Sequence, residues 1–215
     1  MVKKVILIFC FLGIYGCFTK IHHKEYLIKY NSVKDQKLPL NINGFYYTTY
    51  EWKGVKRIKV FILYENGFLV NAGDYDGVSN YFCSDKKFIN DNSYDKAIEN
   101  FKFRLDFLKN SNNLKKLKSC GFDEKDIYNK GLYKIDSKGE IKIQYYNLER
   151  EKEDKDSFNS YFLYELSGKI LNKNEFKITK QKNYRKNKID NEEIHFYFIP
   201  DNNKPEIKNY WIKNN

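Results

Sequence analysis

The chain has 215 residues, a formal net charge of +11, and 19 Tyr, 17 Phe and 2 Trp. This length suits one domain, or at most two small ones, and is enough to bury a core. Eleven Gly and three Pro exclude collagen-like and Gly/Pro-rich low-complexity chains. The many aromatic residues exclude a generic disordered chain, because such chains are poor in them.

The positive charge comes almost entirely from lysine, since only four of the 39 basic residues are arginine. The lysines are scattered, and many lie beside acidic residues, as between positions 149 and 156. A nucleic-acid site usually has arginine forks or a dense basic stripe. The pattern therefore favours a solvated lysine-rich surface, and we expect no nucleic-acid partner.

The N-terminus has the organisation of an export signal. Lysines at positions 3 and 4 precede an apolar run of 12 residues, Val5 to Gly16. A helix that spans a membrane needs about 20 apolar residues. We therefore expect residues 1–16 to be a signal peptide. An uncleaved signal-anchor helix is the alternative.

The segment Ile14-Tyr15-Gly16-Cys17 resembles the lipobox of bacterial lipoproteins. That resemblance implies cleavage between Gly16 and Cys17, a diacylglycerol on the Cys17 thiol, and a further acyl chain such as palmitate on the new amine. Two or three acyl chains anchor a protein stably, whereas one chain binds only marginally. Phe18 stands where an inner-membrane retention signal commonly has Asp. The resemblance thus implies a bacterial envelope protein, anchored in the outer membrane where the cell has one.

Beyond the signal and the lipobox, the chain has two cysteines, Cys83 and Cys120. An oxidising envelope would permit a disulfide between them. Such a bridge closes a loop of roughly 37 residues and contributes about 3–4 kcal/mol in the chain-entropy model. Two separately buried thiols remain the alternative, since sequence separation does not fix the distance between Cα atoms. The cysteines form no Cys-x-x-Cys pair, which argues against a redox or zinc role.

Downstream of Cys17 the chain divides into three parts. We expect a lipid-anchored tether over residues 17–42, with a short strand near Tyr26–Tyr30. A β-rich domain follows over 43–200, and a C-terminal tail over 201–215.

Alternation of apolar and polar residues predicts many short strands in this domain. In one of them, a single face carries Ile58, Val60, Ile62 and Tyr64. The predicted strands are Phe45–Trp52, Arg57–Tyr64, Phe68–Ala72, Gly131–Ile135, Glu140–Tyr146, Ser160–Leu166, Lys169–Leu171, Glu175–Lys180 and Glu193–Ile199. Turns are predicted at Asn66-Gly67, Asp136–Gly139, Ser167-Gly168 and Asn172–Asn174.

One segment departs from the strand pattern. Ser93 is a candidate N-cap. The apolar residues that follow at helical spacing are Ile98, Phe101, Leu105 and Leu108. We therefore predict one helix over about 93–109, packed across an end or a face of the sheet, and a shorter helical turn near 114–119.

The strand count and spacing predict a mainly β fold, an antiparallel barrel or sandwich with one inserted helix. The opening Gly44-Phe45-Tyr46 is similar to the Gly-x-Trp motif of lipocalins, with Tyr in place of Trp. Together with hairpin motifs such as Asn66-Gly67, it makes residues 43–200 resemble small β-rich bacterial lipoproteins with a lipocalin-like barrel. The basic residue that lipocalins pack on that Trp from the last strand has no clear match between 193 and 199. The resemblance implies a fold more than a function, because most such lipoproteins have no known activity.

The sequence contains no recognisable catalytic signature. Of its three histidines, His22 and His23 lie in the expected tether and His195 lies in a predicted strand, a pattern more typical of ordinary surface side chains than of metal ligands. Residues 74–77 resemble a calcium loop only faintly, because the acidic residue required downstream is missing, so we expect a turn there. We expect no metal site, no cofactor and no enzymatic activity.

Three classes of function follow. The first is a binding module that holds a small apolar or glycan ligand in the barrel mouth or on an aromatic face. The second is an interaction lipoprotein that docks another envelope protein and has no ligand pocket, and an enzyme ranks third. A filled barrel interior would favour the second class, whereas a wide cavity lined by Tyr and Phe would favour the first. Residues available for an aromatic face are Tyr46, Tyr47, Tyr50, Trp52, Tyr145, Tyr146, Tyr161, Tyr164 and Tyr197.

Overall fold

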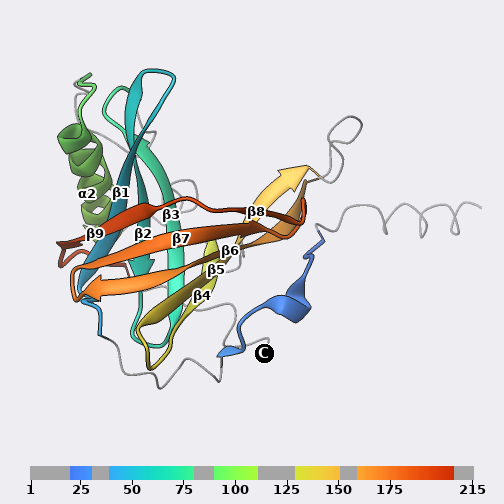
Figure 1. Ribbon diagram of the computed structural model, residues 1–215. Coiled ribbons are helices and arrows are strands. Elements are labelled where there is room, and N and C mark those ends of the chain that lie inside the picture. Colours follow the sequence, from blue (N-terminus) through green and yellow to red (C-terminus); the bar gives the residue numbers. More distant parts are fainter. Residues whose placement is uncertain (1–19, 31–38, 80–89, 111–128, 151–158, 206–215) are drawn as a thin grey trace, which may run out of the picture.

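A computed structural model describes residues 20–30, 39–79, 90–110, 129–150 and 159–205 (Figure 1). Four predictions fall outside these residues: cleavage after Gly16, lipidation of Cys17, the pairing of Cys83 with Cys120, and the helical turn near 114–119. Among the described residues, no helix is both long enough and apolar enough to cross a membrane.

The described residues form a closed antiparallel β-barrel with one helix outside it (Figure 1). The strands are β1 (Gly44–Trp52), β2 (Val55–Leu63), β3 (Phe68–Asp76), β4 (Lys130–Ile135), β5 (Glu140–Arg150), β6 (Asn159–Asn172), β7 (Glu175–Asn183), β8 (Lys188–Asp190) and β9 (Ile194–Pro200). Strands β1 to β7 pair in chain order, including the β6–β7 pair. Strand β9 pairs with both β7 and β1 and so completes a closed ring. The short β8 continues the ladder on β7 beyond β9. The prediction of a mainly β fold with one helix is confirmed, and the barrel is consistent with a lipocalin-like one.

Strand β2 shows how the alternating pattern builds two apolar layers. Ile58, Val60 and Ile62 lie on one face, as the sequence predicts, and this face is buried in a cluster on the outside of the barrel. Phe61 and Leu63 are buried in a second cluster, to which all eight strands of the ring contribute and which therefore fills the interior. Both faces of this strand are covered, so it lacks an exposed polar face.

The helix α2 (Tyr94–Asn110) covers β2 and β3 on the outside. The backbone N–H of Lys96 donates to Ser93 Oγ at 3.2 Å, the expected N-cap contact. Phe101 is fully buried, and its ring meets the ring edges of Phe45 and Tyr75 at centroid distances of 4.7 and 4.9 Å. The sequence prediction of this helix is therefore confirmed to within a residue at each end.

Two predicted turns are wrong because the residues belong to strands. Strand β6 runs through Ser167-Gly168, with a bulge at that point, and Gly168 lies opposite Ile178. A side chain at position 168 would collide with the carbonyl oxygen of Lys177, so glycine serves the close approach of β6 to β7 there. The expected turn over 74–77 is also wrong, since β3 continues to Asp76, whose carboxylate lies 3.3 Å from Arg57 on β2.

The expected strand at Tyr26–Tyr30 is wrong as well. Residues 24–26 form a short 3₁₀ helix, η2 (Lys24–Tyr26), and Leu27 is buried in the outer cluster. The only strand-like contact of this region is a parallel bridge between Ile21 and Tyr161 of β6, within the part of the chain that the structure describes. The described residues 20–30 thus lie packed along the barrel wall; we refer to them as the N-terminal segment.

Candidate functional site

The barrel interior is filled by aromatic rings in direct contact. Ring centroids lie 5.0 Å apart for Tyr46 and Phe176, 5.0 Å for Phe176 and Phe196, and 5.1 Å for Phe196 and Phe61. These four side chains are at most 1% exposed. They come from four neighbouring strands of the ring, β2, β1, β9 and β7, and Phe61 also meets Tyr145 of β5 across the interior at a centroid distance of 5.8 Å. An eight-stranded barrel is just wide enough for side chains to fill it, and these side chains occupy that space as core.

One end of the barrel is closed by polar groups that reach backbone carbonyls. The Tyr133 hydroxyl donates to the carbonyl of Tyr64 at 2.7 Å, and the Tyr46 hydroxyl lies 2.9 Å from that of Asn41. Burial raises the pKa of both phenols well above the ordinary value. At this end the interior is sealed by hydrogen-bonded tyrosines.

Lys204 closes the same end from beyond the last strand. Its ammonium donates to the carbonyls of Ile42 and Leu63 and lies 4.2 Å from the ring centroid of Tyr64. Burial lowers the pKa of Lys204 to about 8. The sequence does not predict the role of Lys204, because its pattern indicates a tail over 201–215 and the lipocalin resemblance points to a basic side chain only between 193 and 199.

At the other end of β1–β3 the polar side chains pair with each other. Asp76 lies 3.3 Å from Arg57 and accepts hydrogen bonds from the backbone of Val78 and Ser79. The Arg57 guanidinium lies 4.8 Å from the ring centroid of Trp52, which is half exposed. These contacts hold the Asp76 carboxylate within the chain, so the ion pair at this end is structural.

A second polar group joins the far ends of β5, β6 and β7. Glu149 lies 2.7 Å from the Arg185 guanidinium and accepts a hydrogen bond from the Tyr164 hydroxyl. Asn183 Nδ2 donates to that hydroxyl at 2.7 Å. Glu149 and Arg185 are each less than one-fifth exposed, so their pairing is structural.

The three histidines lie in two separate surroundings. His195 sits on the outer wall of β9, with Nδ1 2.7 Å from Glu175 and Nε2 3.2 Å from Glu193. Hydrogen bonds to these two carboxylates raise the pKa of His195, and the bond to Glu175 has the larger effect. His22 stacks on the ring of Phe162 at 4.6 Å, and His23 lies beside Tyr184. Within the described ranges, no cluster of His, Cys, Asp and Glu has the form of a metal site.

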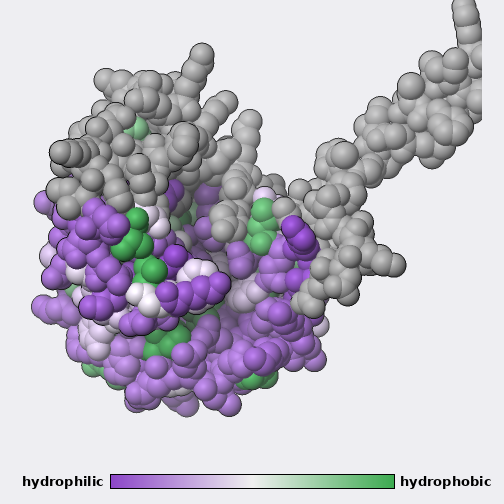
Figure 2. Space-filling view, turned by 90° about the horizontal axis from the view of Figure 1, so that it is seen from above, coloured by the Kyte–Doolittle hydropathy of each residue, from purple (hydrophilic) through white to green (hydrophobic). Residues whose placement is uncertain are grey.

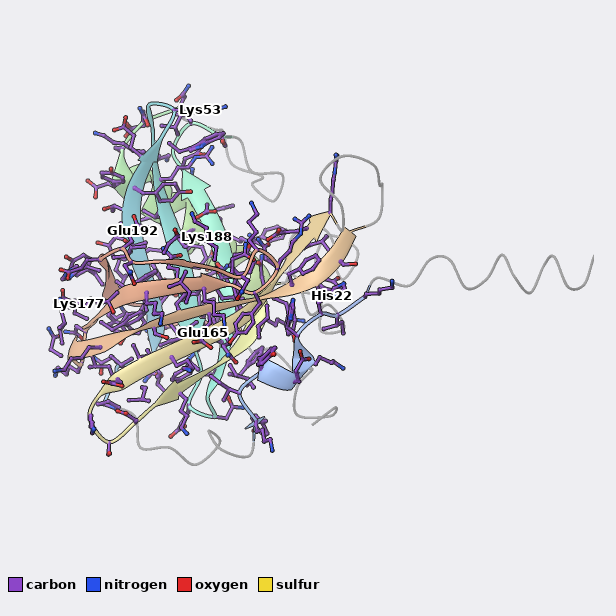
Figure 3. All side chains as sticks on the ribbon, turned by 45° about the vertical axis from the view of Figure 1, so that its right-hand side comes forward. His22, Lys53, Glu165, Lys177, Lys188 and Glu192 are labelled. Carbon is purple, nitrogen blue, oxygen red and sulfur yellow. The ribbon has the colours of Figure 1, made fainter. Side chains whose placement is uncertain are left out.

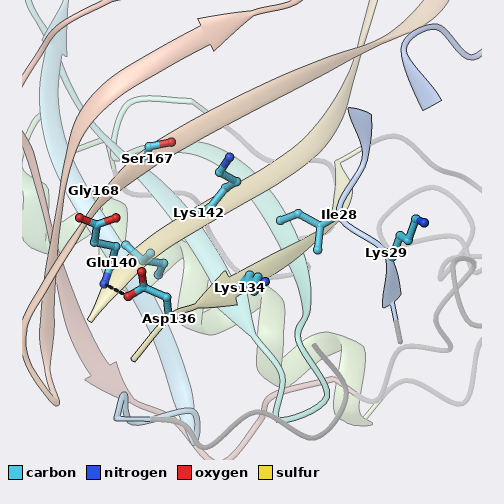
Figure 4. A pocket seen from close by; sticks show the side chains of 9 residues that line it. Ile28, Lys29, Lys134, Asp136, Glu140, Lys142, Ser167 and Gly168 are labelled. Carbon is cyan, nitrogen blue, oxygen red and sulfur yellow. Dashed lines mark hydrogen bonds between the residues drawn. The ribbon is translucent and has the colours of Figure 1, made fainter. Parts of the chain in front are cut away.

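A groove of about 460 Å³ lies on the outer wall, beneath the N-terminal segment (Figure 4). Ile28 and Lys29 form one side, and residues of β4, β5, the turn between them and β6 form the other. Lys134 and Lys142 are cross-strand neighbours in this wall, and Lys142 lies 3.3 Å from Glu165. Five of the nine lining residues are charged, three lysines and two carboxylates, so the groove offers partners for the polar groups of a ligand.

Gln144 holds the N-terminal segment against this wall. Its side chain accepts from the N–H of Ile28 at 2.6 Å and donates to the carbonyl of Tyr26 at 3.1 Å. Its amide also lies 2.6 Å from Glu165 Oε2. Burial opposes ionisation of Glu165, but hydrogen bonds from Gln144 and the charge of Lys142 outweigh it and lower its pKa. Gln144 is 1% exposed, so this buried amide fixes one side of the groove.

The structure divides the aromatic residues that were candidates for one binding face. Tyr46 and Tyr145 lie in the interior, and Tyr146 lies in the outer cluster. Trp52 and Tyr197 are 49% and 45% exposed, but they lie on different parts of the surface. Seen from above, the described surface is mainly hydrophilic, with small and separate hydrophobic patches (Figure 2).

The chain matches no family model, no curated protein and no solved structure. The proposals that follow therefore rest on the sequence and geometry of this chain alone.

Proposed function

We propose that this chain is a lipid-anchored lipoprotein of the bacterial cell envelope that acts through the outer surface of its barrel. Its partner would be another envelope protein. The observation that carries this proposal is the filled interior, where Tyr46, Phe61, Phe176 and Phe196 are in contact and inaccessible to solvent. A barrel with such a core has its outer surface free for recognition. The lipobox-like segment ending at Cys17 supports the anchor.

The absence of catalysis is part of the proposal. The Asp76 and Glu149 carboxylates at the end of the barrel opposite Lys204 are engaged in ion pairs, Asp76 with Arg57 and Glu149 with Arg185. His195, the one histidine with carboxylate partners at hydrogen-bond distance among the described residues, lies on an open wall. A general base needs a substrate held against it in a cleft. These surroundings support a structural or binding role for the described groups.

A small-ligand module is the second candidate, and the outer groove favours it. Its volume of about 460 Å³ falls within the range of ordinary ligand sites. Its lysine- and carboxylate-rich lining favours a glycan or an anionic molecule over an apolar one. In this version the ligand would lie between the N-terminal segment and β4–β5, outside the barrel.

Native mass spectrometry of the full-length protein, extracted from host membranes in mild detergent, tests both versions. We expect a covalent mass increase on Cys17 from the lipid, absent in a Cys17→Ser variant. We also expect no small-molecule adduct on the folded protein. A stoichiometric adduct that disappears on denaturation would overturn the first version in favour of the second, and Lys134→Gln would then show whether the groove holds it.

A further inference from the structure

Basic and aromatic side chains gather where the N-terminal segment meets the hairpin of β7 and β8. We refer to this surface as the basic corner: Lys20, Lys24, Tyr26, Lys182, Lys186 and Ile189. The Tyr26 ring stacks on Tyr184 of the hairpin at a centroid distance of 5.2 Å. Lys182 Nζ lies 4.1 Å from the centroid of Tyr184 and 5.9 Å from that of Tyr26. The two pieces of chain therefore form one surface.

The start of the N-terminal segment is fixed to the barrel. The N–H of His22 donates to the carbonyl of Tyr161 at 2.9 Å, and the N–H of Tyr161 donates to the carbonyl of Lys20 at 2.8 Å. The His22 ring stacks on Phe162, and Figure 3 shows His22 beside the far end of β6. Lys20 consequently has a defined place on the barrel, next to the β7–β8 hairpin.

The basic corner carries an excess of positive charge. Residues 176–189 contain six basic residues and no acidic one. Among the described residues, the acidic ones nearby are Glu25, Glu149, Glu165 and Asp190; Glu149 pairs with Arg185, Glu165 with Lys142 and Asp190 with Lys188. Lys20, Lys24 and Lys186 are exposed. These side chains are therefore accessible to a surface that approaches this corner.

Exposed apolar side chains lie among these charges. Six large hydrophobic side chains are exposed among the described residues, and three of them belong to this region: Tyr26 at 56%, Ile189 at 47% and Leu148 at 36%. Ile189 lies directly opposite Lys182 in the β7–β8 pair, and Leu148 lies opposite Tyr161. Lysine with tyrosine and aliphatic side chains is the composition that favours a membrane–water interface.

The anchor predicted at Cys17 lies very near this surface along the chain. Only Phe18 and Thr19 separate Cys17 from Lys20, and three residue steps span about 10 Å at most. If Cys17 is lipidated, as the proposed function states, Lys20 is held within about 10 Å of the bilayer surface, close to one Debye length at moderate ionic strength.

We propose that the basic corner is a membrane-docking surface, which binds the anionic headgroups of phospholipids in the membrane that holds Cys17. This inference rests on the lipidation in the proposed function and extends it. The anchor alone would let the barrel rotate, whereas the corner fixes its orientation. The β6–β7 and β4–β5 turns, at the other ends of those strands, then point away from the membrane toward a partner.

The test uses the full-length lipoprotein, with lipid on Cys17 confirmed by mass spectrometry. It is placed in detergent, in phosphatidylcholine vesicles, or in vesicles with about 30 mol% phosphatidylglycerol. A membrane-impermeant reagent acylates exposed lysines, and peptide mass spectrometry measures each one. We expect labelling of Lys24, Lys182 and Lys186 to fall about threefold or more in the anionic vesicles alone, and to recover at high salt. Lys173, on the β6–β7 turn, should label equally in all three.

Two triple variants with the same loss of charge separate the corner from net charge. Replacing Lys24, Lys186 and Lys188 with Gln should abolish the protection of Lys182, while replacing Lys138, Lys169 and Lys173 should leave it intact. Equal labelling of corner lysines in detergent and anionic vesicles, or equal protection in both vesicle types, would overturn the headgroup site and leave the lipoprotein assignment standing. A protein without lipid on Cys17 would overturn the proposed function and this inference together.

Discussion

Lys204 makes the stability of the barrel depend on pH in an unusual direction. Burial lowers its pKa in the folded state to about 8, from 10.5 for a free side chain. Between these values the unfolded chain binds more protons than the folded one, so the free energy of unfolding rises with pH. The neutral amine keeps two N–H groups, enough for the carbonyls of Ile42 and Leu63.

We predict that stability to urea rises by about 1–2 kcal/mol between pH 7.5 and 9.5, allowing for solvent screening of a partly exposed group. A Lys204→Met variant should lose this rise, and the exposed Lys173→Met control should keep it. Above pH 10 the trend should reverse, because burial raises the pKa of Tyr46, Tyr64 and Tyr133 in the folded state. A wild-type profile parallel to that of Lys204→Met would contradict the role of Lys204.

Gln144 gives a second prediction at this scale. Replacing it with Leu removes the acceptor for Ile28 N–H and the donor to the carbonyl of Tyr26, and leaves Glu165 without its amide partner. We expect a loss of about 1–3 kcal/mol in unfolding free energy, the usual cost of unpaired buried polar groups. Hydrogen exchange should accelerate at residues 26–28. Gln181→Leu, whose amide contacts Glu192 at the surface, should change neither quantity.

The helix α2 is held to the barrel mainly by Phe101. The residue is fully buried between Phe45 and Tyr75, so Phe101→Ala leaves a cavity beneath the helix. We predict a loss of about 3–5 kcal/mol in urea unfolding. Lys102, the next residue, is exposed, so Lys102→Ala is the matched control and should leave the unfolding free energy nearly unchanged. A loss below about 1 kcal/mol for Phe101→Ala would mean that the helix contributes little to the fold.

At the level of elements, local sequence patterns predicted most strands of the barrel. They failed where contacts with distant residues determine the local structure. Alternation placed Ile58, Val60 and Ile62 correctly, and the Ser93 cap located α2, because both signals are contained in a few neighbouring residues. The pair Ser167-Gly168 has the composition of a turn, and only the close approach of Lys177 from β7 shows that it belongs to a strand.

The candidate sites were less predictable than the strands. The N-terminal segment is fixed by Gln144, which lies 116 residues from Ile28 along the chain, and Lys204 reaches Ile42 across 162 residues. No local periodicity encodes such contacts. The outer groove and the basic corner both depend on where that segment lies, so the sequence alone predicts neither. The lipobox-like segment at Cys17 stays a prediction from sequence.

At the scale of the whole molecule, closure makes the barrel one cooperative unit. The β6–β7 pairing is the last seam of the ring, and Phe176 beside it belongs to the interior aromatic contacts. Opening this seam would expose rings from strands on the opposite wall, since Phe61 of β2 packs against Phe196 and Tyr145. A defect at the seam should therefore lower the stability of every strand in the ring.

Gly168→Val tests this cooperativity, because its side chain would collide with the Lys177 carbonyl across the seam. We predict a loss of about 3 kcal/mol in unfolding free energy. Hydrogen exchange should rise together in β1–β2, β5–β6 and β7–β9, since amides of a cooperative unit share one opening free energy. Leu171→Val, at an exposed position near the end of the same strand, is the control and should leave exchange unchanged. If Gly168→Val accelerated exchange only in β6 and β7, the ring would open locally, and the packed interior would not be what unites the barrel.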